Sequence, residues 1–118
     1  MASKKILVIE DDDDIRISLR EILELEKLNV VLAANGQQGL DQLGAHSDVR
    51  VVLLDMMMPV MDGWEFLKRM KSNQQWSSIP VIAISAAGLN PSTVSAEFFL
   101  KKPLDLEVLL DTIQRLCD

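Results

Sequence analysis

The sequence predicts an α/β protein with a three-layer, doubly wound fold around one parallel five-stranded sheet, in the flavodoxin-like order 2-1-3-4-5. Short apolar runs bounded by turn residues are typical of strands that are buried on both faces of a parallel sheet. Segments with apolar residues at helical spacing separate most of these runs. Alternating strands and helices make right-handed crossovers, which place helices on both faces of the sheet.

Five apolar runs are predicted to form the strands. They cover residues 6–9, 28–33, 51–54, 79–84 and 98–101. The third run leads into a single carboxylate, Asp55, and the Pro and Asp-Gly that follow it indicate a turn. Pro80 is tolerable because it stands near the start of the fourth strand.

Helical spacing of apolar residues predicts the helices. The apolar positions fall within 15–23, 36–43, 66–70 and 106–113, with the second helix weak. Asp105 is placed to cap the last helix. Asp12–Asp14 are interpreted as acidic residues at the first helix's amino terminus, where the helix dipole favours anions.

The helix between the fourth and fifth strands is predicted to be shortened or missing. Residues 86–96 alone make this connection, and a parallel crossover needs about a dozen residues or more. Gly88, Asn90 and Pro91 are poor helix formers, so we expect one short turn after Pro91 or none. Few large apolar side chains hold this segment to the sheet, and we expect it to be the mobile, switching part of the molecule.

Length and composition restrict the class of protein. The 118 residues are predicted to form a single domain, 1–118, and 48% of them are hydrophobic. The net charge of −6 and the lack of a basic run argue against direct nucleic-acid binding. Cys117 is the only cysteine, which excludes an intramolecular disulfide and a cysteine metal cluster. Without a membrane span or signal-peptide core in the sequence, we expect a cytoplasmic protein.

Carboxylates stand at the ends of two strands that neighbour each other in the predicted sheet. Glu10 and Asp11 end the first strand, and Asp55 ends the third. Three carboxylates in one cleft repel one another unless a cation joins them, and Mg²⁺ prefers oxygen ligands of this kind. Mn²⁺ is expected to substitute for it.

Two further strand ends complete the predicted site. Ser85 ends the fourth strand, and Lys102 ends the fifth, directly before Pro103. A carboxylate nucleophile, a metal site, a hydroxyl donor and a fixed cation are the groups that phosphoryl transfer requires. The carboxylate can be the covalent acceptor and form an aspartyl phosphate.

On these residues the chain, from Ile6 to about Leu116, resembles a receiver domain of bacterial two-component response regulators. The matching pieces are Ile-Leu-Val-Ile-Glu-Asp-Asp (6–12), Leu-Leu-Asp-Met-Met-Met-Pro-Val-Met-Asp-Gly (53–63), Ser85-Ala86 and Lys102-Pro103. Each piece alone is a weak signal, whereas the ordered set is specific.

The resemblance implies a role for each site residue. These are Asp55 as phosphoacceptor, Glu10 and Asp11 as the acidic pair with Asp11 on Mg²⁺, the Met57 carbonyl as a further metal ligand, Ser85 and Lys102 on the phosphoryl group, and Phe99 as the switch aromatic. It also implies a phosphohistidine donor, on a sensor histidine kinase or histidine phosphotransfer protein, and an unknown downstream protein. Such a chain assists its own phosphorylation and dephosphorylation but is not a turnover enzyme.

The sequence departs from the family pattern at two places. Met57 is apolar where many members carry a polar side chain, and we expect it to lengthen the life of the phosphoryl group. Ala87, two residues after Ser85, cannot orient a water either. The segment from Ser85 to Lys102 is several residues shorter than usual, which affects the usual output surface.

Other readings remain open. A receiver domain cut from a larger regulator or hybrid kinase fits equally, and a small Mg²⁺-dependent aspartyl phosphohydrolase shares the chemistry but normally needs a cap. The acidic run at 10–14 would repel the phosphate of a flavodoxin-type cofactor, and the complete residue set argues against a pseudo-receiver. Trp64 is expected to pack at the start of its helix, His46 to be exposed, and Trp76 is undecided.

Overall fold

The computed structural model describes residues 5–86 and 89–117. Its strands are β1 (Lys5–Ile9), β2 (Asn29–Ala33), β3 (Val49–Asp55), β4 (Val81–Ser85) and β5 (Phe98–Lys101). They form one parallel sheet in the order β2-β1-β3-β4-β5, which confirms the predicted topology.

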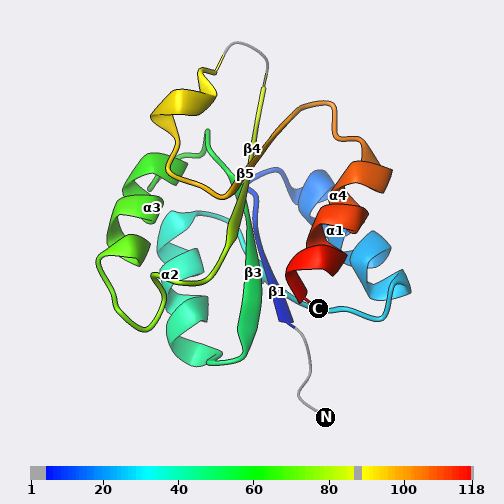
Figure 1. Cartoon of the computed structure of the whole chain (residues 1–118), viewed down its shortest axis with the longest axis horizontal. Coiled ribbons are helices and arrows are strands. Elements are labelled where there is room, and N and C mark those ends of the chain that lie inside the picture. Colours follow the sequence, from blue (N-terminus) through cyan, green and yellow to red (C-terminus); the bar gives the residue numbers. More distant parts are fainter. Residues whose placement is uncertain (1–4, 87–88, 118) are drawn as a thin grey trace.

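Four α-helices of the described chain cover the two faces of the sheet. They are α1 (Asp13–Leu25), α2 (Gly36–Ala45), α3 (Gly63–Lys71) and α4 (Leu106–Cys117). Helices α2 and α3 lie on one face, and α1 and α4 lie on the other (Figure 1). The three-layer arrangement is therefore the one that the alternation of strands and helices predicts.

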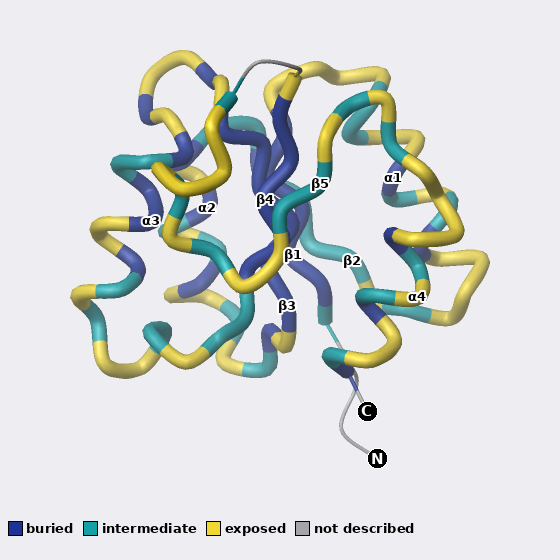
Figure 2. The backbone as a smooth tube through the Cα atoms, turned by 45° about the horizontal axis from the view of Figure 1, so that its top comes forward, coloured by how far each residue is buried: buried dark blue, intermediate teal, exposed yellow. Residues whose placement is uncertain are grey.

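The core has two halves, one on each side of the sheet. Because strand side chains alternate, Leu7 and Ile9 pack under α2 and α3, whereas Ile6 and Val8 pack under α1 and α4. In β3 every residue except Arg50 is buried. Figure 2 shows the buried centre as a dark-blue sheet between half-exposed helices.

Helix starts follow the local chemistry of their capping residues. Asp12, Asn35 and Asp62 each accept a hydrogen bond from the backbone N–H three residues further on. Asp105 accepts from the N–H groups of Glu107 and Val108, as expected of a cap. The interpretation of the acidic run after Asp11 as helix-terminal is confirmed, since Asp12 is the N-cap and two further acids fill the first turn.

The predicted starts of β3 and β4 were wrong by two residues, and those of β1 and β2 by one. Strand β4 begins at Val81 and not at Ile79, because the Ile79 N–H donates to the Trp76 carbonyl in a preceding turn. Strand β3 begins at Val49, earlier than predicted, because a register shift beside Lys5 lets the pairing continue past Arg50.

His46 was predicted to be exposed, and this was also wrong. It is half-buried where α2 ends, and its Nδ1 lies 3.2 Å from the Lys5 ammonium. Trp64 packs against the core from the second position of α3, as predicted, and Trp76 also contacts the core.

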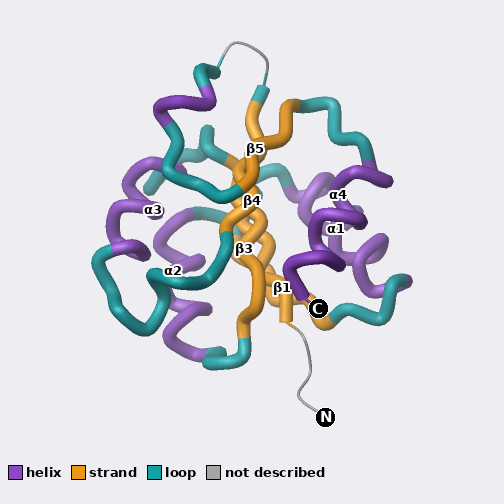
Figure 3. The backbone as a smooth tube through the Cα atoms, viewed as in Figure 1, coloured by secondary structure: helices purple, strands orange, loops and turns teal. Residues whose placement is uncertain are grey.

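The connection between β4 and β5 contains only a 3₁₀ turn, η1 (Pro91–Thr93). This confirms the prediction of a shortened fourth helix and places the turn directly after Asn90. Asn90 caps it by accepting from the Ser92 N–H at 3.0 Å. Ala87 and Gly88, which belong to this connection in the sequence, lie outside the described residues. Figure 3 shows most of the connection as loop.

Candidate functional site

The candidate site lies at the carboxyl edge of the sheet, where β1 and β3 end side by side. Ile9 pairs with Leu54, so the residues that follow each strand meet at this edge. Each of Glu10, Asp11 and Asp55 offers one carboxylate oxygen, and these oxygens lie within 4.8 Å of one another. The structure thus brings together the three acids that the sequence singled out.

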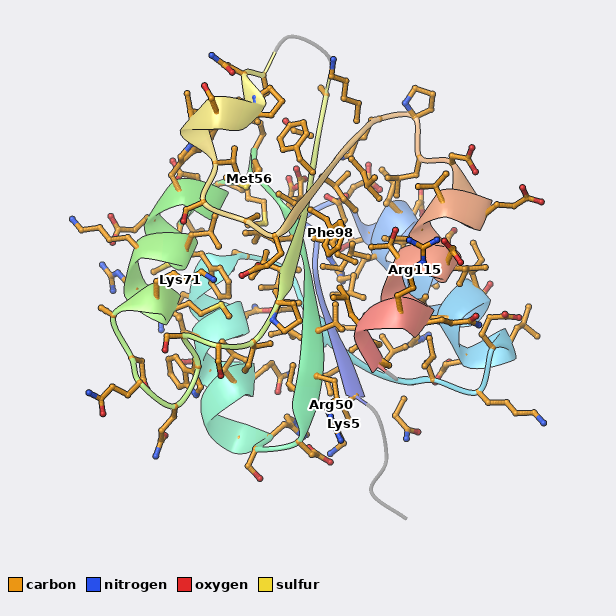
Figure 4. All side chains as sticks on the ribbon, viewed as in Figure 1. Lys5, Arg50, Met56, Lys71, Phe98 and Arg115 are labelled. Carbon is orange, nitrogen blue, oxygen red and sulfur yellow. The ribbon has the colours of Figure 1, made fainter. Side chains whose placement is uncertain are left out.

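Asp55 is held in one orientation. Its side chain is 6% exposed, and its Oδ1 accepts from the Met57 N–H at 3.1 Å. Met56, labelled in Figure 4, is fully buried, and its carbonyl accepts from the Gly63 N–H at 3.0 Å. A Cβ on Gly63 would lie 2.6 Å from the Met56 sulfur, so only glycine allows this close approach. The turn after β3 is therefore fixed against the start of α3.

Lys102 supplies the positive charge of the site. Its Nζ lies 3.3 Å from Glu10 Oε1 and 3.7 Å from Asp55 Oδ2. Its backbone N–H donates to the Ser85 carbonyl at 2.8 Å, which ties the end of β5 to the end of β4. Burial alone lowers the pKa of Lys102, but the negative charges of Asp55 and Glu10 outweigh it and raise that pKa. Lys102 is thus a permanent cation at neutral pH.

Glu10 shows the electrostatic cost of crowding the carboxylates. Its burial, followed by its hydrogen bond and repulsion with Asp55, raises the pKa of Glu10 from 4.5 to about 8. The Asp12 N–H and Lys102 act in the opposite direction but do not offset this. At neutral pH the raised pKa therefore favours the protonated form of the Glu10 carboxyl.

These residues fit a hard divalent cation. A cation among the three carboxylates would offset their mutual repulsion, and Mg²⁺ is bound by oxygen ligands with several waters retained. Asp11 is exposed whereas Glu10 and Asp55 are buried, so the group is open to solvent on the Asp11 side.

Arg16, in the first turn and a half of α1, is also part of this site. Its Nη1 donates to the Glu10 carbonyl at 2.8 Å, and the Asp11 carbonyl lies 3.5 Å away. Its Nη2 pairs with the Asp13 carboxylate, and the side chain is only 15% exposed. Arg16 thus clamps the backbone of the loop that carries the acidic pair. Helical periodicity could not reveal this, because the contact depends on the course of the loop before α1.

The other predicted site residues surround the carboxylates at greater distance. Ser85 ends β4 one residue beyond Ile84, which pairs with Asp55. Phe99 pairs with Ala83 and packs, half-buried, into the core under α2 and α3. Strand alternation puts Ser85 on the same face of the sheet as Phe99. Within the described residues, no hydrogen bond joins the Ser85 hydroxyl to the carboxylates.

Met57 lies at the rim of the site. Its backbone is tied to Asp55, whereas the residue as a whole is 60% exposed. In the part of the chain that the structure describes, no helix is both long and apolar enough to cross a membrane.

Comparisons with known proteins agree on one family. The model of the response regulator receiver domain matches residues 6–114. The transcriptional regulatory protein CpxR of Escherichia coli K12 is 36% identical over 115 residues, covering 93% of this chain and 47% of that protein. Sporulation initiation phosphotransferase F of Bacillus subtilis is 36% identical over 120 residues, covering 98% of this chain and 94% of that protein.

Solved structures give the same result. The chemotaxis protein CheY4 of Vibrio cholerae superposes with a TM-score of 0.86 at 29% identity, covering 98% of this chain and 99% of that one. The chain spans about half or less of the length of the curated transcriptional regulators that it matches, and nearly the whole of the sporulation phosphotransferase.

Proposed function

Because the chain belongs to the response regulator receiver domain family, we propose that it is a switch that accepts a phosphoryl group on Asp55. The donor is a phosphohistidine of a sensor histidine kinase or histidine phosphotransfer protein. The phosphorylated chain then binds a downstream protein differently. The observation that carries this proposal is the buried Asp55 carboxylate, oriented by the Met57 N–H and facing both Lys102 and the acidic pair.

The transfer is a direct displacement at phosphorus. A carboxylate oxygen of Asp55 forms the new P–O bond while the P–N bond to the imidazole breaks. The electron pair of the P–N bond stays on the imidazole nitrogen, which takes up a proton. Lys102, next to Asp55 Oδ2, is placed to balance the charge of the phosphoryl oxygens. Ser85, at the end of the neighbouring strand, is proposed to donate a hydrogen bond to the same group.

Asp11 and Asp55, with the backbone carbonyl of Met57, are proposed to hold the Mg²⁺, and Glu10 to support Asp11. Bound there, Mg²⁺ or Mn²⁺ neutralises phosphoryl oxygens. Repulsion from Asp55 contributes, after burial, to the raised pKa of Glu10, and it supports this assignment because a cation bound here would offset that repulsion.

The donor is proposed to be a protein, since exposed apolar side chains lie in the two segments that follow the site's carboxylates. Met57 is 60% exposed, Val60 in the same turn is 83% exposed, and Ile17 near the start of α1 is 41% exposed. Exposed apolar side chains around a reactive group are typical of a surface that meets another protein. The net charge of −6 makes direct contact with nucleic acid unfavourable.

We propose that the chain does not turn over a free substrate and assists only its own phosphorylation and dephosphorylation. The exposed Met57 supports a long-lived aspartyl phosphate, because its side chain offers no hydrogen bond to an attacking water. The phosphohistidine donor implies work in the cytoplasm, and the free, buried Cys117 is compatible with a reducing compartment.

Intact-mass measurement after incubation with acetyl phosphate and Mg²⁺ tests the proposal. We expect the mass of one phosphoryl group to be added, and we expect Asp55→Asn to abolish it. Asp41→Asn, the same change at an exposed residue of α2, is the matched control and should label normally. A labelled peptide that excludes Asp55 would overturn the proposal.

A further inference from the structure

A groove lies between α3 and the segment that follows η1. Its volume is about 260 Å³, and it is lined by Trp64, Leu67, Lys68, Lys71, Thr93 and Ser95. The two walls are far apart in the sequence but are joined by the hydrogen bond from the Trp64 indole N–H to the Thr93 carbonyl at 3.2 Å, and α3 is further tied to the segment after η1 by the Lys71–Glu97 ion pair. Figure 1 shows η1 beside the first turns of α3.

The groove exists because η1 is so short. A turn of three residues cannot cover the side of α3 that faces it, and Pro91, Ser92 and Thr93 are all exposed. Trp64 therefore remains half-exposed although it packs against the core. Tryptophan in a partly covered pocket is the side chain most often found to dominate binding energy at protein interfaces.

The charged residues that line the groove are basic, in a chain of net charge −6. Lys71 is paired with Glu97 at 3.0 Å. Within the described chain Lys68 has no ion pair within 4 Å, and the nearby Glu65 is taken by Arg69 at 2.9 Å. Lys68 is therefore positioned to meet an acidic group on whatever occupies the groove.

The volume decides between a small molecule and a peptide. Pockets for drug-sized ligands run from about 300 to 1,000 Å³, so this groove is smaller than most of them. It suits one apolar side chain resting on Trp64 and Leu67, with a carboxylate reaching Lys68. We propose that the groove binds an acidic peptide segment of a partner protein, anchored by one leucine or phenylalanine.

The groove also lies between the two elements that border the reactive site. Gly63, next to Trp64, packs on Met56, which follows Asp55 directly. The opposite wall belongs to the connection that leaves β4 at Ser85. A change at the site would therefore reach both walls. This coupling rests on the proposed function, whereas the peptide binding itself does not.

The test uses the unphosphorylated full chain and three synthetic ten-residue peptides. The first carries a central leucine flanked by aspartates and glutamates, the second has lysines in place of the acids, and the third has alanine in place of leucine. Binding is followed by the NMR signals of the two indole N–H groups. We expect saturable shifts of Trp64 with the first peptide only, while Trp76, which is not in the groove, reports any non-specific effect.

Two variants and one control locate the binding. Lys68→Glu should weaken binding of the acidic peptide by about fivefold or more, because one attraction becomes a repulsion. Ser95→Phe should abolish binding by filling the groove. Arg50→Glu carries the same charge change at the opposite end of the molecule (Figure 4) and should bind as the parent does.

The Asp55→Asn chain should bind the acidic peptide as the parent does, so failure of the phosphorylation proposal is seen separately. An absence of Trp64 shifts, or equal shifts with the lysine and acidic peptides, would overturn the groove as an acidic-peptide site. Equal weakening in Lys68→Glu and Arg50→Glu would do the same, since it would show only a response to net charge.

Discussion

Two loops at the same edge of the sheet are built in opposite ways. The turn after β3, residues 56–62, buries Met56, Met58 and Met61, although Pro59 and Val60 are exposed. Its backbone is tied to α2 and to α3, through the Gly36 N–H to the Met61 carbonyl at 3.3 Å and the Gly63 N–H to the Met56 carbonyl at 3.0 Å. The described part of the connection from β4 to β5 has no fully buried residue before β5 begins, and only Leu89, Val94 and Ala96 pack against the core, each half-buried.

The hydrogen bonds of the two loops differ in the same way. In the connection the hydrogen bonds are mostly local. The Asn90 side chain accepts from the Ser92 N–H and hydroxyl, and the Asn90 carbonyl accepts from the Thr93 N–H and hydroxyl. Its long-range ties are the Trp64 indole to Thr93 and the Glu97 carboxylate to Val81 and Lys71. The difference indicates that the two loops have different roles. Reactive groups must be held in place before the reaction, whereas a segment that responds to the reaction must have a low free energy of local opening.

Hydrogen exchange gives the largest expected contrast. Amides of 89–96 should exchange at least about a hundredfold faster than those of 56–62, because few buried contacts resist opening of the connection. Beryllofluoride with Mg²⁺, used as a phosphoryl analogue, should slow 89–96 and leave 56–62 unchanged. Strong protection of both loops in the free chain would contradict the comparison.

The pH dependence of stability should show the free-energy cost of a charged Glu10 in the buried site. An unfolded chain releases the Glu10 proton near 4.5, whereas the folded chain keeps it up to a pKa of about 8. The folded state therefore binds more protons in this window, and its free energy of unfolding should fall as pH rises from about 5 to 8, by a few kcal/mol. Urea denaturation in EDTA measures this fall.

Other shifted groups act outside that window. The pKa of Glu97 is lowered, because hydrogen bonds from Val81 and Lys71 outweigh its burial, and that of Lys102 is raised above 10.5. Glu10→Gln should remove most of the fall in the free energy of unfolding between pH 5 and 8, and saturating Mg²⁺ should do the same. Glu21→Gln, at an exposed position of α1, should leave the fall unchanged. If the free energy of unfolding of Glu10→Gln falls with pH as steeply as that of the parent, the pH dependence comes from other groups.

The sequence predicted the sheet and the acidic cluster because both depend on short-range patterns. Each buried strand is a continuous apolar run, and the parallel order brings Glu10, Asp11 and Asp55 to one edge. The short η1 followed from the length of the connection and its poor helix formers. These features require no knowledge of how distant side chains pack.

Other features depend on distant contacts and could not be predicted. Arg16 has the helical position of a solvated residue, and only the loop before α1 brings the Glu10 carbonyl within its reach. His46 is half-buried because Lys5, far away in the sequence, lies beside it. The groove beside Trp64 depends on where the η1 segment crosses α3.

Arg16 offers the next test of the rigid region. Arg16→Gln removes the clamp on the Glu10 carbonyl, so we expect Mg²⁺ affinity to fall by about three- to tenfold, as for the loss of one charge-assisted hydrogen bond. Arg20→Gln is the matched control, since Arg20 lies one turn further on and pairs only loosely with Glu24, at 3.8 Å. Mg²⁺ titration by calorimetry measures both, and urea denaturation separates affinity from stability.

Arg16→Lys keeps the charge but has a single donor head, so it should restore only part of the affinity. Tighter Mg²⁺ binding in Arg16→Gln, with parental binding in Arg16→Lys, would show instead that Arg16 repels the cation. Arg16 would then not be needed to hold the loop after β1 in place for Mg²⁺ binding.

A substitution at Val60 has the smallest expected effect. It is 83% exposed and has a φ of 69° in the turn after β3. A β-branched side chain is disfavoured there, and asparagine tolerates this conformation better. Val60→Asn should therefore raise the free energy of unfolding by about 1 kcal/mol, because it relieves strain and loses almost no buried surface.

Val108→Asn is the control for this last change. Val108 is 46% exposed in α4, where valine and asparagine have similar helix propensity, so a small loss of stability is expected there and no gain. A loop whose surroundings hold a strained backbone conformation in place should become more stable when a substitution relieves that strain. If Val60→Asn leaves stability unchanged in urea denaturation, the turn carries no strain at Val60, and its rigidity rests on the buried methionines and hydrogen bonds alone.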